Sequence, residues 1–208
     1  MHKKTLSSAL LILAIASSHA ENTNTAPLSG YVYNAQGCYG FTAPHGWKLD
    51  NKILADQGVG MAFYPADSNW DNASMAIYTQ IYTNPHAENS DTLIAAEINT
   101  LREMYKADNI EIHAKKLETI RSKAGSEGEL WQLNYSNGLE EQIAYFPIPP
   151  KSLGVFVLQM DARTDKSKAT AALRTLAESY QPRQTCKPCA QANACKTATP
   201  YPLGAVDN

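Results

Sequence analysis

The sequence predicts an α+β domain in which a mainly antiparallel β-sheet is flanked by two helices, forming an α-β-α sandwich. Short apolar segments with strand character are joined by turns and hairpins rather than by helical crossovers, which is typical of antiparallel sheets. The apolar period changes from two to about 3.6 in two places, so two amphipathic helices can cover the sheet. Roughly 150 residues lie between the polar ends of the chain, the usual size of one domain.

The chain begins with the pattern of an export signal. Two lysines precede an apolar run over residues 9–16, and Ser18 and Ala20 place small residues before a cleavage site at Glu21. The run is well short of the ~20 residues that a membrane span needs. We therefore expect a signal peptide over residues 1–20, a periplasmic or secreted mature protein, and no transmembrane segment.

The mature protein is expected to be mildly acidic. Cleavage after Ala20 leaves 16 basic and 20 acidic residues, a formal net charge of −4 with the histidines neutral. The basic residues do not cluster, so the chain lacks the charge pattern that binds nucleic acid or an anionic membrane. We expect neither of these as a partner.

Polar, turn-rich segments bound the predicted domain on both sides. Residues 21–37 are expected to form an N-terminal linker and residues 38–182 a single α+β domain. Residues 183–208 are rich in Ala, Pro, Thr and Lys without a sustained apolar period, which predicts a C-terminal tail.

The first half of the domain contains two strand candidates and a helix. Residues 59–64 and 73–83 have strand character, and both faces of the second are apolar, which predicts a central strand covered on both sides. Asn89 and Ser90 form an N-cap pair, and the period then becomes helical until about residues 108–109. The apolar stripe of this helix contains Ile94, Ile98, Leu101 and Tyr105.

The second half contains four strand candidates and a second helix. The strands are expected at residues 110–120, 129–135, 139–146 and 153–160. Asn137-Gly138 predicts a tight hairpin, and the prolines in residues 147–150 predict a stiff loop without ladder pairing. Thr164 and Asp165 cap the last helix, which Pro182 closes. Its apolar stripe contains Ala169, Leu173, Leu176 and Tyr180.

The segment Tyr39-Gly-Phe-Thr-Ala-Pro-His-Gly-Trp47 and the element order after it resemble the PsbP-like family. Members include the extrinsic photosystem II protein and bacterial relatives among periplasmic proteins and type VI effector chaperones. The resemblance covers about residues 38–180. It implies an α-β-α sandwich and non-catalytic work in binding, chaperoning or assembly. The family has no shared catalytic residues to carry over, and the cysteine-containing tail is not part of its pattern.

Four cysteines form an even set in a chain expected to be exported. They are Cys38, Cys186, Cys189 and Cys195. Oxidising conditions predict two disulfides, with three possible connectivities. We expect Cys38 to be linked to Cys186 and Cys189 to Cys195, with Cys38 linked to Cys195 and Cys186 to Cys189 as the alternative.

The Cys186-Lys187-Pro188-Cys189 segment has the spacing of a redox-active pair. In the thioredoxin arrangement such a pair opens a helix, whereas this pair follows a helix in the tail, so a structural role is expected and a redox role is the alternative. Structural zinc usually needs a second closely spaced pair, which the sequence lacks. We therefore expect neither a metal nor a cofactor.

The sequence contains no recognisable catalytic constellation. It has no Gly-x-Ser-x-Gly or Ser-x-x-Lys motif. Glu140 and Glu141 are adjacent in a predicted strand, so their side chains point to opposite faces and cannot hold one substrate atom together. This favours a non-enzymatic protein.

Trp70, in a polar loop over residues 65–72, is the first candidate for a ligand surface. A loop tryptophan either folds back on the core or stands out as an anchor for a partner. Together with Tyr78 and Tyr82 on the adjoining strand it forms our candidate binding surface. We expect a non-enzymatic, exported accessory domain that binds a protein or an envelope component; the alternative is a thiol-disulfide protein using Cys186 and Cys189.

Overall fold

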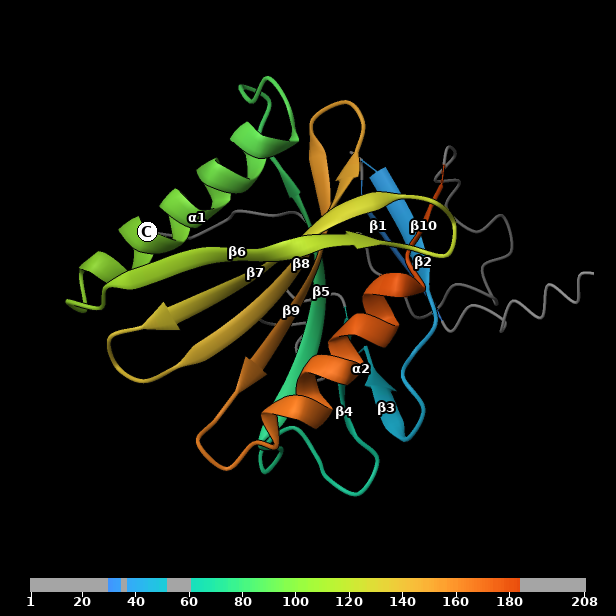
Figure 1. Ribbon diagram of the computed structural model, residues 1–208, viewed down its shortest axis with the longest axis vertical. Coiled ribbons are helices and arrows are strands. Elements are labelled where there is room, and N and C mark those ends of the chain that lie inside the picture. Colours follow the sequence, from blue (N-terminus) through green and yellow to red (C-terminus); the bar gives the residue numbers. More distant parts are fainter. Residues whose placement is uncertain (1–29, 35–36, 52–60, 184–208) are drawn as a thin grey trace, which may run out of the picture.

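The computed structural model describes residues 30–34, 37–51 and 61–183. In these residues a seven-stranded sheet and a three-stranded sheet are combined with two helices (Figure 1). The strands are β1 (Gly30–Asn34), β2 (Gly37–Phe41), β3 (Trp47–Asp50), β4 (Met61–Pro65), β5 (Met75–Thr83), β6 (Ile112–Arg121), β7 (Glu127–Tyr135), β8 (Glu140–Ile148), β9 (Ser152–Met160) and β10 (Gln181–Pro182). The helices are α1 (Ser90–Lys106) and α2 (Lys166–Glu178). Neither is long and apolar enough to cross a membrane.

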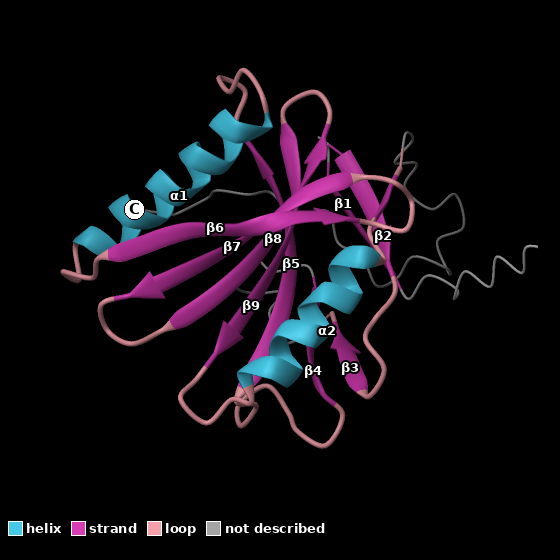
Figure 2. Ribbon diagram, viewed as in Figure 1, coloured by secondary structure: helices cyan, strands magenta, loops and turns pink. Residues whose placement is uncertain are grey.

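The large sheet has the strand order β3-β4-β5-β9-β8-β7-β6, and every pairing in it is antiparallel. Alternating side chains of its central strands enter two different cores. Phe156 and Leu158 of β9 pack with α2, whereas Val155 and Val157 pack with α1. The two helices therefore cover opposite faces, and the predicted α+β class with a mainly antiparallel sheet is confirmed (Figure 2).

Helix α1 begins at a complete capping box. The Asn89 side chain accepts a hydrogen bond from the backbone N–H of Thr92, and the Thr92 hydroxyl accepts one from the N–H of Asn89. After the helix, Asn109 has a φ of 56°, a left-handed conformation that asparagine tolerates better than most residues. The buried face contains Leu93, Ile94, Glu97 and Ile98.

Helix α2 is capped by Asp165, whose carboxylate accepts hydrogen bonds from the N–H groups of Ser167 and Lys168. The helix ends at Glu178. Tyr180, which the sequence analysis places on the helical stripe, instead follows the helix and stacks on Phe146 with ring centroids 4.3 Å apart. The buried face of the helix contains Ala169, Ala172, Leu173, Leu176 and Ala177.

The small sheet has the order β1-β2-β10 and joins the two ends of the domain. β1 lies inside residues 21–37, where the sequence analysis expects a linker, and this part of the expectation is wrong because β1 pairs along its whole length with β2. Tyr39 ties the small sheet to the large one. Its fully buried hydroxyl lies 3.1 Å from the carbonyl oxygens of both Gln80 and Val155.

The structure of residues 147–150 also differs from the sequence-based expectation. Pro147 and Ile148 belong to β8 and pair with Leu153 and Ser152 of β9, although the sequence predicts no ladder pairing there. Pairing of β8 with β7 ends at Tyr145, so none of the described strands pairs with the side of Pro147 that lacks an N–H. Its carbonyl oxygen accepts instead from the Tyr180 hydroxyl, at 3.4 Å.

Candidate functional site

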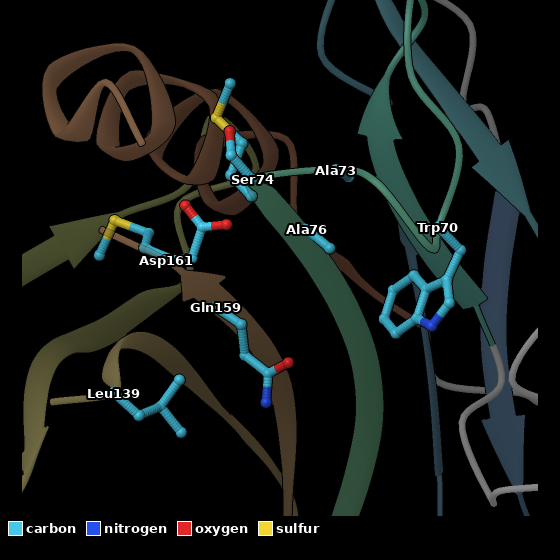
Figure 3. Close-up of a pocket in the computed structure, with 9 residues that line it drawn as sticks. Trp70, Ala73, Ser74, Ala76, Leu139, Gln159 and Asp161 are labelled. Atoms are coloured by element: carbon cyan, nitrogen blue, oxygen red, sulfur yellow. The ribbon is translucent and has the colours of Figure 1, made fainter. Parts of the chain in front are cut away.

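A small cavity of about 230 Å³ opens beside the β4–β5 turn. Trp70 from this turn forms one wall, and residues at the ends of β5, β9 and β8 form the others. The lining residues are Trp70, Ala73, Ser74, Met75, Ala76, Leu139, Gln159, Met160 and Asp161. Figure 3 shows Trp70 on one side of β5 and Gln159, Asp161 and Leu139 on the other.

Hydrogen bonds within the turn hold Trp70 in place. The side chains of Asn69 and Asn72 each accept from the backbone N–H of the other, at 3.1 and 2.9 Å. The Asn69 carbonyl also accepts from the N–H of Ala73 at 2.9 Å. Trp70 is half-buried, so it is neither fully folded back on the core nor fully exposed. Its side chain lines the cavity.

The cavity combines apolar walls with two polar groups. Asp161 accepts a hydrogen bond from Arg163 Nε at 2.9 Å, and this contact lowers the pKa of the carboxyl group. The Gln159 amide nitrogen donates to Glu141 Oε1 at 2.8 Å. Leu139, Met160 and Ala76 supply apolar surface. Such a site can hold an apolar side chain and hydrogen-bond to a polar group next to it.

The other two residues of the predicted surface do not line this cavity. Tyr78 and Tyr82 follow Ala76 on the same face of β5, and both rings pack against the core beneath α1. Burial, followed by the Glu141 carboxylate, raises the pKa of Tyr78 well above its usual value. The structure thus separates Trp70 from the two tyrosines that the sequence analysis grouped with it.

A buried polar cluster lies between α1 and the sheet. It contains two carboxylates, Glu97 of α1 and Glu141 of β8, which are 4% and 3% exposed. Glu97 Oε1 accepts from the Gln80 side-chain amide at 3.2 Å. Glu141 accepts from the Tyr135 hydroxyl at 2.6 Å and from Gln159 at 2.8 Å.

Burial disfavours a charge on either carboxylate. It raises the pKa of Glu97 to about 7, although the nearby Tyr145 hydroxyl and the hydrogen bond from Gln80 act in the opposite direction. It also raises the pKa of Glu141, despite the hydrogen bonds from Tyr135 and Gln159. Among the described residues, no lysine, arginine or histidine forms an ion pair with either group.

The sequence analysis above does not predict this cluster, although part of its signal is visible in the sequence. Glu97 falls between Ile94 and Ile98 within the apolar stripe of the helix, where a charged residue is unusual. Glu141 does point away from Glu140, as predicted: Glu140 pairs with Lys166 on the α2 side. Nothing local in the sequence indicates that Glu97 packs on the same face as Glu141.

Cys38 is buried on β2, beside the point where the described chain ends. The N–H of Arg183 donates to the Cys38 carbonyl at 3.3 Å, and Cys38 Sγ lies 3.9 Å from the Arg183 carbonyl oxygen. The Arg183 guanidinium lies 5.1 Å from the centre of the Tyr31 ring. The Cys38 thiol is not free. The other three cysteines, and the predicted signal peptide, lie outside the described residues.

No cluster of three or more His, Cys, Asp or Glu side chains in the described ranges could hold a metal ion. His45, His86 and His113, which could in principle bind zinc, are exposed and come from separate parts of the chain.

Comparisons with known proteins give structural similarities without a sequence match. No protein-family model matches the chain, and no curated protein matches it. The cyanobacterial PsbP protein (CyanoP) of Synechocystis is similar over 74% of this chain and 92% of its own, with 15% identity and a TM-score of 0.49. The Ran-binding protein Mog1p of Saccharomyces cerevisiae is similar over 71% of this chain and 84% of its own chain, with 12% identity and a TM-score of 0.42.

A protein of Bacteroides thetaiotaomicron is similar over 70% of this chain and 45% of its own, with 8% identity and a TM-score of 0.36. The matches thus include a member of the PsbP-like family that the sequence resembles. At this level of similarity we take neither a function nor a partner from them.

Proposed function

We propose that this protein is an exported, non-enzymatic accessory domain that binds a protein partner through the cavity at Trp70. The observation that carries the proposal is the position of Trp70, half-buried on a hydrogen-bonded turn at the edge of a cavity with apolar walls, with Gln159 and Asp161 on the opposite side of the cavity. Aromatic residues that line a small pocket are typical anchors of protein interfaces.

The size of the cavity favours a protein side chain over a free small molecule. Its volume of about 230 Å³ is below the range of roughly 300–1,000 Å³ that sites for drug-sized ligands occupy. An apolar side chain of a partner fits such a volume. Its neighbouring backbone amides can then bond to the Gln159 carbonyl or the Asp161 carboxylate.

The place of action that we propose is the periplasm or the extracellular space. The signal-peptide pattern over residues 1–20 and the even number of cysteines support it. The same compartment would allow the alternative, a redox role for Cys186 and Cys189. No contact in the described residues favours that alternative, because both cysteines lie outside them.

Site-specific photo-cross-linking in the producing cell tests the binding site. A benzophenone amino acid at position 70 is expected to give a cross-linked product of defined mass. The matched control places the same group at Met104, which is 65% exposed on α1, away from the cavity. With the captured partner purified, Trp70→Ala should weaken binding by at least about tenfold, as loss of an interface anchor does. Equal products from both positions, or unchanged binding, would refute the proposed site.

A further inference from the structure

The inward face of α1 contains a carboxylate that is only half satisfied. Glu97 Oε1 accepts a hydrogen bond from Gln80, but Glu97 Oε2 is buried without a hydrogen-bond partner in the part of the chain that the structure describes. The hydroxyl of Tyr145, on the strand below, is also buried without a partner of standard geometry. Unpaired buried oxygens destabilise the packed state, and a charged one does so most.

Among the described residues, the groups that face Glu97 cannot balance a negative charge. β5 contributes Gln80 and the hydroxyl of Tyr78, and β7 contributes that of Tyr135. β8 contributes Tyr145 and a second carboxylate, Glu141, whose negative charge opposes ionisation of Glu97. These groups are neutral or acidic. Glu97 is therefore best accommodated on the sheet as a neutral acid.

We propose that α1 is a pH-responsive element, in which a proton on Glu97 keeps the helix packed on the sheet and loss of that proton lets the helix detach locally. The protonated carboxyl group can donate from Oε2 to the Tyr145 hydroxyl, which would satisfy both unpaired atoms. The ionised group leaves a charge between α1 and the sheet beside Glu141, and detachment of the helix returns that charge to water. This inference is independent of the Trp70 cavity.

The direction and range of the pH effect follow from the two states of Glu97. In the packed state its pKa is about 7, against 4.5 for an exposed glutamate. The stabilisation of the packed helix by protonated Glu97 is complete below pH 4.5. It is lost as the pH rises through 7, because Glu97 ionises more readily in the detached state. These two pKa values imply that the population of detached helix grows roughly 20-fold between pH 5.5 and 7.5.

Amide hydrogen exchange of the purified protein, followed by NMR and corrected for intrinsic exchange rates, measures this population. We expect amides in the middle of α1 to lose roughly 20-fold in protection between pH 5.5 and 7.5. Amides of α2 should change little, since its buried face consists of alanines and leucines. Glu97→Gln, a neutral side chain of the same shape, should abolish the loss in α1.

Two further variants distinguish this device from a general pH effect. Glu103→Gln removes an exposed carboxylate from the same helix and should behave like the unmodified protein. Tyr145→Phe removes the acceptor proposed for the protonated carboxyl group, so the protection of α1 at pH 5.5 should fall. The proposal is overturned if the pH dependence persists in Glu97→Gln or if the protection of the α1 amides does not change with pH. It is also overturned if the α2 amides lose as much protection as those of α1.

Discussion

Trp70 is half-buried, and this position allows its proposed role in binding to be tested separately from a role in folding. The turn that carries it is held by the amides of Asn69 and Asn72 rather than by the indole ring. The sheet below is covered by Ala76 and Leu139, among others, which remain when the ring is removed. The ring is therefore available to a partner without being needed for the core.

Trp70→Ala is accordingly expected to change the free energy of unfolding by less than about 1 kcal/mol, the usual range for substitutions outside the core. Urea denaturation of the variant and the unmodified protein measures this. A loss of several kcal/mol would instead identify Trp70 as part of the core, and it would then be withdrawn from the binding site.

Tyr135 allows the buried cluster to be tested at a single atom. Its hydroxyl donates to Glu141 Oε2 at 2.6 Å, and Tyr135→Phe removes that bond. We expect the pKa of Glu141 to rise further and the free energy of unfolding at pH 8 to fall by about 1–3 kcal/mol. The deficit should shrink as the pH is lowered, because a protonated Glu141 needs the donor less.

Tyr105→Phe is the matched control for that substitution. Tyr105 packs edge-on against Tyr135 with ring centroids 5.2 Å apart, and phenylalanine keeps this ring contact. Denaturation curves at pH 8 and pH 5 for both variants suffice. An equal loss in the two variants, or the same deficit for Tyr135→Phe at both pH values, would contradict the role assigned to the hydrogen bond.

At the scale of elements, the small sheet is joined to the large one by close packing at Gly154. A Cβ atom on Gly154 would lie 2.9 Å from the Tyr39 ring and 3.0 Å from the Tyr180 ring. Both rings are fully buried, so they have no free space to move into.

Gly154→Ala should therefore push β2 away from β9 and lower the free energy of unfolding by about 1–3 kcal/mol, as overpacking of a core does. Thermal and urea denaturation measure the loss, and exchange of the β2 amides should increase along with it. The control is Ala144→Gly in the neighbouring strand β8, which shortens a core side chain instead of crowding it. Comparison of the two variants separates the effect of crowding from the effect of replacing any small core residue. Unchanged stability of Gly154→Ala would show that the two sheets have room to separate.

The elements that the sequence predicts are those fixed by local patterns. Capping residues and a 3.6-residue period define α1, and the positive φ of Gly138 fits the predicted turn between β7 and β8. β1 and β10 are short and are stabilised by pairing with β2, more than a hundred residues from β10 in sequence, so no local pattern reveals them. Whether Pro147 can pair depends on which strands lie on either side of β8. This too cannot be read from the local sequence.

The candidate sites likewise contain residues that the sequence indicates and residues that only the fold brings together. Trp70 stands out in the sequence as a large aromatic residue in a polar loop, and the structure places it at a cavity. Tyr78 and Tyr82 share its neighbourhood in sequence but face the core beneath α1. Glu97 and Glu141 lie 44 positions apart, and their common environment is created by the packing of a helix on a sheet.

For the whole molecule, the decisive feature is that both ends of the domain meet at one strand. β1 and β10 pair with opposite edges of β2, and Arg183 continues from β10 alongside Cys38. The guanidinium of Arg183 also contacts Tyr31 of β1, with a hydrogen bond of 3.1 Å to its hydroxyl. The described chain therefore ends at Arg183, beside the buried Cys38, and three cysteines follow in the sequence.

We predict that a disulfide from Cys38 to Cys186 closes the domain at this point, with Cys189 linked to Cys195. Cys186 follows Arg183 by three residues, the shortest spacer of the tail cysteines. A bridge that encloses more than ~100 residues stabilises a chain by about 4–5 kcal/mol in the chain-entropy model. Reduction should thus lower the melting temperature without changing the secondary structure at room temperature. Non-reducing peptide mapping identifies the pairs: Cys38 linked to Cys195 would refute the pairing but keep the tie, and a free Cys38 would refute both.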